Sequence, residues 1–134
     1  MGLGLKVVEK EKYKQNKDSS VRLIRLRGGQ TAGEHQELIV TLQDGTLVRM
    51  SRNHTDDTFQ FGAAEQGEKS WPTFKEITPS TVITCQQVYR AFKAEHKVMP
   101  EYHLGDCQMF AQKIFARLTP EIKEQLPDTL DDFM

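Results

Sequence analysis

The dipeptide Asp44-Gly45 separates two apolar, β-rich runs, residues 36–42 and 46–52. Asp-Gly between two such runs is the strongest short-range signal for a β-hairpin, because a two-residue turn needs positive φ angles at both central positions. The sequence therefore predicts an antiparallel pair of strands near the middle of the chain.

A two-residue loop also fixes which residues of the two strands face each other. The numbers of facing residues then sum to 89, so Glu37 faces Arg52 and His35 faces His54. The first pair joins opposite charges, which cross-strand contacts favour. The second pair would bring two imidazoles together at the open end of the hairpin.

Other β-rich runs predict further strands. Residues 5–14 and 21–27 are predicted strands, the second because its side chains alternate in a β-rich run, and the two are interpreted as a second hairpin. Phe59 and Phe61 alternate in a short strand, and residues 62–70 are polar and glycine-containing, as in a mobile loop. These runs indicate an antiparallel β-sheet.

Helices are predicted in the second half of the chain. Thr84 and Gln87 have the spacing of a capping box, and an apolar stripe follows as far as about His96. A short helix is also expected from Thr119, followed by an acidic tail within residues 119–134. The fold class expected is α+β, an antiparallel sheet with two to three helices packed on it.

The most informative helix is expected to start at Asp106, whose side chain can cap the free N–H groups of the first turn. Cys107 is then the first helical residue, where the helix dipole favours the thiolate and lowers the pKa of the thiol. The apolar side chains that follow have amphipathic spacing, at Phe110, Ala111, Ile114, Phe115 and Leu118.

The run 102–118, YHLGDCQMFAQKIFARL, resembles the helix start of the circularly permuted papain-like proteins, which include NlpC-type and lecithin:retinol acyltransferase-like cysteine hydrolases. The resemblance implies a single permuted papain-like domain over residues 1–134. It also implies that Cys107 is the nucleophile, with His35 as its base and His54 as a second histidine from the neighbouring strand. Asp106 stands where asparagine is more usual, and its negative charge would oppose thiolate formation.

Several alternatives remain open at this point. Cys85 also opens a predicted helix and is a rival nucleophile, although either cysteine can simply be a small buried hydrophobe. Ser51 and Asn53 are alternatives to His54 as the residue that orients the base. A zinc site from His96, His103 and Cys107 is conceivable, but its spacing matches no standard finger, and no metal or cofactor is expected.

Charge and hydropathy narrow the possible partners. Residues 5–27 hold eight basic and three acidic side chains, whereas residues 119–134 hold one basic and five acidic ones, within a net charge of −1. No platform for nucleic acid is evident, but the acidic tail, residues 128–134, could meet a protein partner. No leader or membrane span is expected, and the two cysteines form no disulfide framework, so a cytoplasmic location is predicted.

The sequence thus predicts a small cysteine hydrolase or acyltransferase that acts on a peptide, isopeptide or acyl ester bond. The alternative is a catalytically degenerate protein-interaction module with the same fold.

Overall fold

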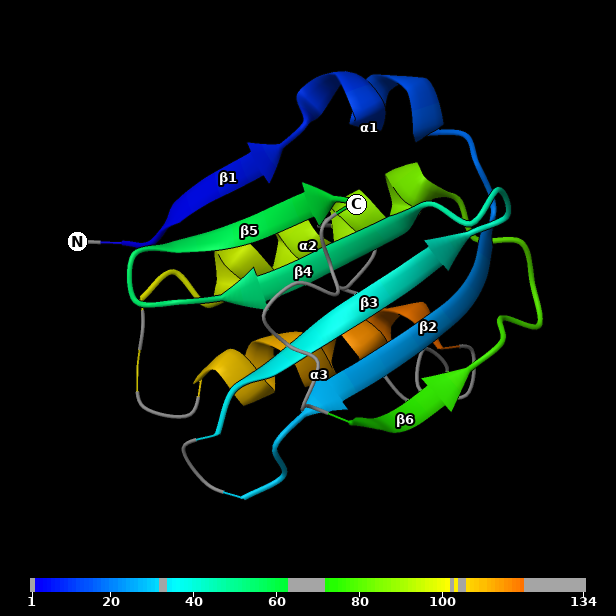
Figure 1. The fold of residues 1–134 in the computed structure, drawn as a ribbon. Coiled ribbons are helices and arrows are strands. Elements are labelled where there is room, and N and C mark those ends of the chain that lie inside the picture. The colour runs from blue at the N-terminus through cyan, green and yellow to red at the C-terminus, as the bar shows by residue number, and fades with distance from the viewer. Residues whose placement is uncertain (1, 32–33, 63–71, 102, 104–105, 120–134) are drawn as a thin grey trace.

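The computed structural model describes residues 2–31, 34–62, 72–101, 103 and 106–119. Within them, six strands form one sheet in the order β1-β5-β4-β3-β2-β6, and three helices accompany it (Figure 1). The elements in chain order are β1 Gly4–Val8, α1 Lys10–Asn16, β2 Val21–Gly28, β3 Gln36–Leu42, β4 Leu47–Arg52, β5 Asp56–Phe61, β6 Thr73–Ile77, α2 Cys85–Val98 and α3 Asp106–Leu118. The α+β class is therefore confirmed.

The sheet is mixed and not wholly antiparallel. β2, β3, β4 and β5 follow one another as an antiparallel meander, β6 pairs antiparallel with the outer side of β2, and β1 runs parallel to β5. The expected hairpin between residues 5–14 and 21–27 is wrong, because β1 and β2 lie at different places in the sheet. Two parallel strands need a long connection between them. Here the connection from β1 to β5 consists of α1 and the antiparallel strands β2, β3 and β4.

The expected strand 5–14 is also too long. β1 ends at Val8, Glu9 has a left-handed φ of 67°, and α1 begins at Lys10. Lys, Glu and Gln dominate α1, and these residues have good helix propensity that outweighs the weak alternation of the run. Tyr13 of α1 lies over the sheet, with its ring centroid 6.1 Å from that of Phe59 and 4.8 Å from that of Tyr89.

Helices α2 and α3 cover one face of the sheet (Figure 1), and the core lies between these helices and the sheet. Thr84 caps α2 through the predicted capping box, since its side chain accepts from the N–H of Gln87 and the Gln87 side chain accepts from the Thr84 N–H. The core-facing side chains of the sheet alternate along each strand, and the buried set comprises Ile24, Leu26, Leu38, Val40, Leu42, Val48, Met50, Phe59, Phe61, Phe92, Phe110, Ile114 and Phe115 among others. No helix in the described part of the chain is both long and apolar enough to span a bilayer.

The central hairpin has a different register from the one expected. Facing residues sum to 88, so Leu38 pairs with Met50 and Val40 with Val48. The Gly45 N–H donates to the Leu42 carbonyl at 2.9 Å, and Gly45 alone in this turn has a positive φ, of 91°. The loop therefore has three residues, a type I turn followed by a left-handed glycine, instead of two.

This shift removes the expected pairs. Continued past Leu38, the observed register places Glu37 opposite Ser51 and not opposite Arg52. β4 ends at Arg52, and His54 lies between β4 and β5, so the hairpin does not pair His54 with His35. The predicted helix after Thr119, the acidic tail and most of the predicted loop 62–70 lie outside the described residues.

We expect Gly45→Ala to destabilise the protein by about 1–2 kcal/mol, because a Cβ there has open space around it but an alanine is strained at a left-handed φ. Urea unfolding would measure the change. Gly4→Ala is the matched control, since its Cβ would meet only ordinary contacts, the nearest at 3.5 Å. Equal midpoints for the two variants would contradict the three-residue turn.

Candidate functional site

Cys107 lies in the first turn of α3, as the helix pattern predicted, and is 8% exposed. Its Sγ is 3.7 Å from the carbonyl oxygen of Glu34, in the peptide unit that continues into His35. The neighbouring Gln108 side chain donates to the carbonyl oxygens of Thr31 and Glu34, at 2.8 Å each. The start of α3 is thus fastened to the backbone that precedes β3.

A glycine at the end of β2 permits this arrangement. Gly28 has a φ of 128°, and a Cβ at this position would collide with the carbonyl oxygen of His35. The next residue, Gly29, donates its N–H to that same carbonyl at 3.0 Å. Only glycine allows the two backbones to approach so closely, so the path of the chain at His35 depends on Gly28.

The His35 ring is directed toward Glu37, two residues further along. His35 Nε2 is 3.7 Å from Glu37 Oε1, and the His35 side chain is 29% exposed. Gln36, between them, points the other way, because its side chain accepts from the Gln112 amide of α3 at 2.8 Å. Strand alternation therefore puts Glu37 on the sheet face opposite α3. The structure brings the His35 backbone to Cys107 and the His35 ring to Glu37.

Glu37 is the centre of a buried ionic group. Its side chain is fully buried, with Oε2 2.7 Å from Arg27 Nε and Oε1 3.6 Å from Arg49 Nε. Burial alone would raise the pKa of Glu37, but hydrogen bonding with His35 and Arg27, together with the positive charges of Arg49 and Arg27, outweighs it and leaves this pKa below its usual value. The sequence indicated no such cluster, because the expected register matched Glu37 with a different arginine.

Asp106 lies inside α3 as its first residue instead of capping it from outside. Its carboxylate accepts from the His103 N–H at 2.8 Å, while the Asp106 N–H donates to the His103 carbonyl at 3.0 Å. Arg52 Nη1 lies 3.5 Å from the same carboxylate. A cation at this distance offsets part of the negative charge of Asp106.

Arg52 is fully buried and joins four parts of the fold. Its Nε and Nη2 form a bidentate pair with Asp57 at 2.7 and 2.9 Å, and Nη2 also donates to the carbonyl of Met99. The guanidinium carbon lies 4.6 Å from the centroid of the Phe110 ring. His96 Nδ1 approaches the second oxygen of Asp57 at 2.7 Å. This network sets the start of α3 against β4, β5 and the end of α2.

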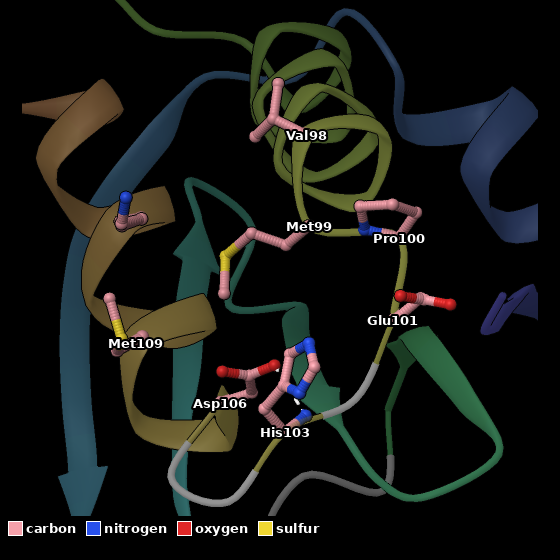
Figure 2. A pocket seen from close by; sticks show the side chains of 8 residues that line it. Val98, Met99, Pro100, Glu101, His103, Asp106 and Met109 are labelled. Carbon is pink, nitrogen blue, oxygen red and sulfur yellow. Dashed lines mark hydrogen bonds between the residues drawn. The ribbon is translucent and has the colours of Figure 1, made fainter.

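A hollow of about 290 Å³ lies between the end of α2 and the start of α3 (Figure 2). Figure 2 shows Met99, His103 and Asp106 around it, with Met109 on the α3 side. Cys107 is not among its lining residues. A second hollow, of about 310 Å³, is lined by Leu26, Phe74, Lys75, Gln112 and Phe115, between α3 and β6.

The remaining sequence candidates lie in the core, in β4 or in the turn that follows it. Cys85 is fully buried, and burial raises its pKa to about 12, so it is a core side chain and not a nucleophile. Asn53 accepts from the N–H groups of Thr55 and Asp56 within its own turn. Ser51 is buried in β4, and His54 lies in the exposed turn after it.

The zinc site considered from His96, His103 and Cys107 does not form. His96 Nδ1 is directed to Asp57, and the described residues contain no group of three histidine, cysteine or acidic side chains that could hold a metal ion.

Comparisons with family models, curated proteins and solved structures gave no match to this chain. The resemblance to permuted papain-like proteins therefore stays a prediction.

We expect iodoacetamide to alkylate Cys107 but not Cys85 in the native protein at pH 8, because only Cys107 combines a helix start with some exposure. Peptide mass spectrometry would locate the label. Unfolding in urea should make both thiols reactive, which serves as the control. Native labelling of Cys85 at the rate of Cys107 would contradict the assignment.

We expect Arg52→Met to destabilise the fold by about 3–5 kcal/mol, because it leaves the buried Asp57 carboxylate without its main cation. Arg22→Met, at an exposed position of β2, should stay within about 0.5 kcal/mol of the parent. Urea unfolding of both variants would test the network; similar midpoints would refute it.

Proposed function

We propose that this protein is a small cysteine hydrolase or acyltransferase of permuted papain-like form, with Cys107 as nucleophile and His35 as base. The observation that carries the proposal is the contact between Cys107 Sγ and the peptide unit that leads into His35, at 3.7 Å from its carbonyl oxygen. A thiol at the start of a helix, with the main chain of a histidine close by, has the parts of an activated nucleophile once the imidazole reaches the sulfur.

The chemistry would run in two steps. His35 takes the proton of the Cys107 thiol, and the thiolate attacks an acyl carbon to form a thioester as the bond to the leaving group breaks. The imidazolium then returns its proton to the leaving amine or alcohol. Water, or an acceptor alcohol or amine, attacks the thioester with His35 again as base, releasing the acyl group and restoring the thiol.

Two features of the site support this reactivity. The backbone N–H groups of the first turn of α3 lack carbonyl partners within the helix, and they are suitable donors to the oxyanion that develops on the acyl oxygen. Arg52 lies 3.5 Å from the Asp106 carboxylate beside the sulfur-bearing turn and offsets part of its charge. The ring of His35 must turn toward the sulfur when substrate binds, since its Nε2 now faces Glu37.

The hollow between α3 and β6 suits the apolar part of a substrate. Gln108, Gln112 and Phe115 lie on one face of α3, so a chain leaving the sulfur can follow this face to the hollow, about two helical turns away. Leu26, Phe74 and Phe115 offer apolar walls there. A peptide, isopeptide or acyl ester remains the proposed substrate class.

A protein-interaction module is the second candidate function. One observation favours it: the described contact of the His35 ring leads to Glu37, while the thiol donates to a carbonyl. In this case a partner protein would bind the acidic tail, residues 128–134. This binding would survive Cys107→Ala, and removal of the tail would abolish it. A pull-down with these two variants would separate binding from catalysis.

We expect p-nitrophenyl acetate to acetylate Cys107 in the native protein, with a burst of nitrophenol that Cys107→Ser abolishes. Intact mass and peptide mapping would identify the thioester. Cys85→Ala is the matched control, because it removes the other thiol from the core and should leave the burst unchanged. A parent protein that shows no acetylation above the rate of a free thiol would refute the proposed activity.

A further inference from the structure

We propose that the hollow between α3 and β6 binds an apolar group that carries a carboxylate. The hollow has a volume of about 310 Å³ and is lined by Leu26, Phe74, Lys75, Gln112 and Phe115. This volume lies at the lower end of the range for small-ligand sites, about 300–1,000 Å³. The inference deepens the proposed function, because it names the chemistry that this part of the site selects.

A β-bulge in β6 brings two adjacent side chains to the hollow. Lys75 pairs with Leu26 of β2, but Thr73 pairs with the next residue of β2, Arg27, so Phe74 is an extra residue in β6. Adjacent side chains of a regular strand point to opposite faces of the sheet, and a bulge can redirect one of them. Phe74 and Lys75 both line the hollow as a result, so one strand supplies an apolar wall and a cation.

The walls of the hollow are held in place by their own contacts. Phe115 is a buried member of the core, and Phe74 is partly buried against this core. The Gln112 amide donates to Gln36 Oε1 of β3 at 2.8 Å, which fixes the wall formed by α3. A ligand therefore meets surfaces that are already ordered, so little conformational entropy is lost when it binds.

Lys75 is the charged member of this lining. Its Nζ lies 5.2 Å from the centroid of the Phe115 ring, and this cation–π contact keeps the ammonium beside the apolar wall. Within the described residues, no carboxylate lies at ion-pair distance from Lys75. The neighbouring acid in β6, Glu76, is opposite Arg25 of β2 in the sheet register.

An ammonium without an acidic partner attracts an anion and donates hydrogen bonds to it. One lysine matches the single charge of a carboxylate, whereas a phosphate monoester carries nearly two charges at neutral pH. The apolar walls select the group to which this carboxylate is attached. The hollow thus favours an apolar carboxylate over both a neutral apolar group and a phosphate.

The hollow lies along the helix that bears Cys107. Gln108, Gln112 and Phe115 follow one side of α3, and Phe115 is eight residues after Cys107. This separation corresponds to about 12 Å along the helix axis. A substrate with its acyl carbon at the sulfur would place its carboxylate about 12 Å away, three to four residues of an extended peptide. Only this step, from ligand to substrate, rests on the proposed function.

The binding is tested by an NMR titration of the full chain with 4-phenylbutyrate and with its neutral analogue, 4-phenylbutanol. We expect backbone amide shifts at Phe74, Lys75 and Gln112, and a lower Kd for the carboxylate than for the alcohol. In Lys75→Gln the Kd for the carboxylate should rise about fivefold and that for the alcohol should not change, because only the charge contact is lost. Lys75→Arg should keep the preference for the carboxylate.

Lys93→Gln is the matched control, because Lys93 also lies over an aromatic ring, 5.5 Å from the centroid of Tyr89 on α2, and does not line the hollow. It should leave both Kd values unchanged. Phe74→Ala should weaken the carboxylate and the alcohol alike, since it removes an apolar wall and no charge.

A second pair of probes distinguishes the two sources of such a carboxylate: the peptide acetyl-Asp-Phe-amide and its neutral analogue acetyl-Asn-Phe-amide. A preference for the acidic peptide that Lys75→Gln removes would support the inference and assign an acidic peptide ligand. A preference confined to 4-phenylbutyrate would support the inference and assign a free carboxylic acid.

Equal Kd values for the carboxylate in Lys75→Gln and Lys93→Gln, or shifts only at residues outside the hollow, would overturn the inference whether or not Cys107 is acetylated. Binding does not need the thiol, so Cys107→Ser should have the Kd of the parent. A parent that binds 4-phenylbutyrate through Lys75 but is not acetylated would refute the proposed function and leave this binding site standing.

Discussion

The interaction on which most of this structure depends is the burial of the Arg52 guanidinium among oxygen acceptors from distant parts of the chain. A bare guanidinium in the core would be strongly unfavourable, and it is tolerated here because Asp57 meets it with two oxygens and because Asp106 and the Met99 carbonyl share the rest of its donors. These partners come from β5, from the start of α3 and from the end of α2. The position of the cysteine-bearing helix thus follows from a charge on the sheet.

The start of α3 is held from two sides. On one side Asp106 accepts from the His103 N–H and lies beside Arg52; on the other, Gln108 donates to two carbonyl oxygens of the segment before β3. Cys107 lies between these two attachments. The nucleophile proposed above would need a fixed position relative to its base, and a helix start fastened to both the sheet and the loop supplies this better than a helix packed through apolar contacts alone.

Where the sequence predicted the structure well, the signals were local. The capping box at Thr84 and the amphipathic spacing of α3 depend on residues within a few positions of one another, and both are confirmed. The hairpin expected between residues 5–14 and 21–27 was wrong, because the pairing of β1 with β5 is a distant contact that no local pattern encodes. The Arg52 and Glu37 clusters were missed for the same reason, since each joins strands whose relative position follows from the register.

The register of the central hairpin links these results. A loop of three residues instead of two moves β4 by one position relative to β3. Core side chains of the two strands then face each other, for example Val40 and Val48. The same step takes Glu37 away from Arg52, so each charge must find other partners: Glu37 lies between Arg27 and Arg49 on one face, and Arg52 pairs with Asp57 on the other. One left-handed glycine, Gly45, thereby separates the two ionic clusters, so that one positions α3 and the other faces the His35 ring.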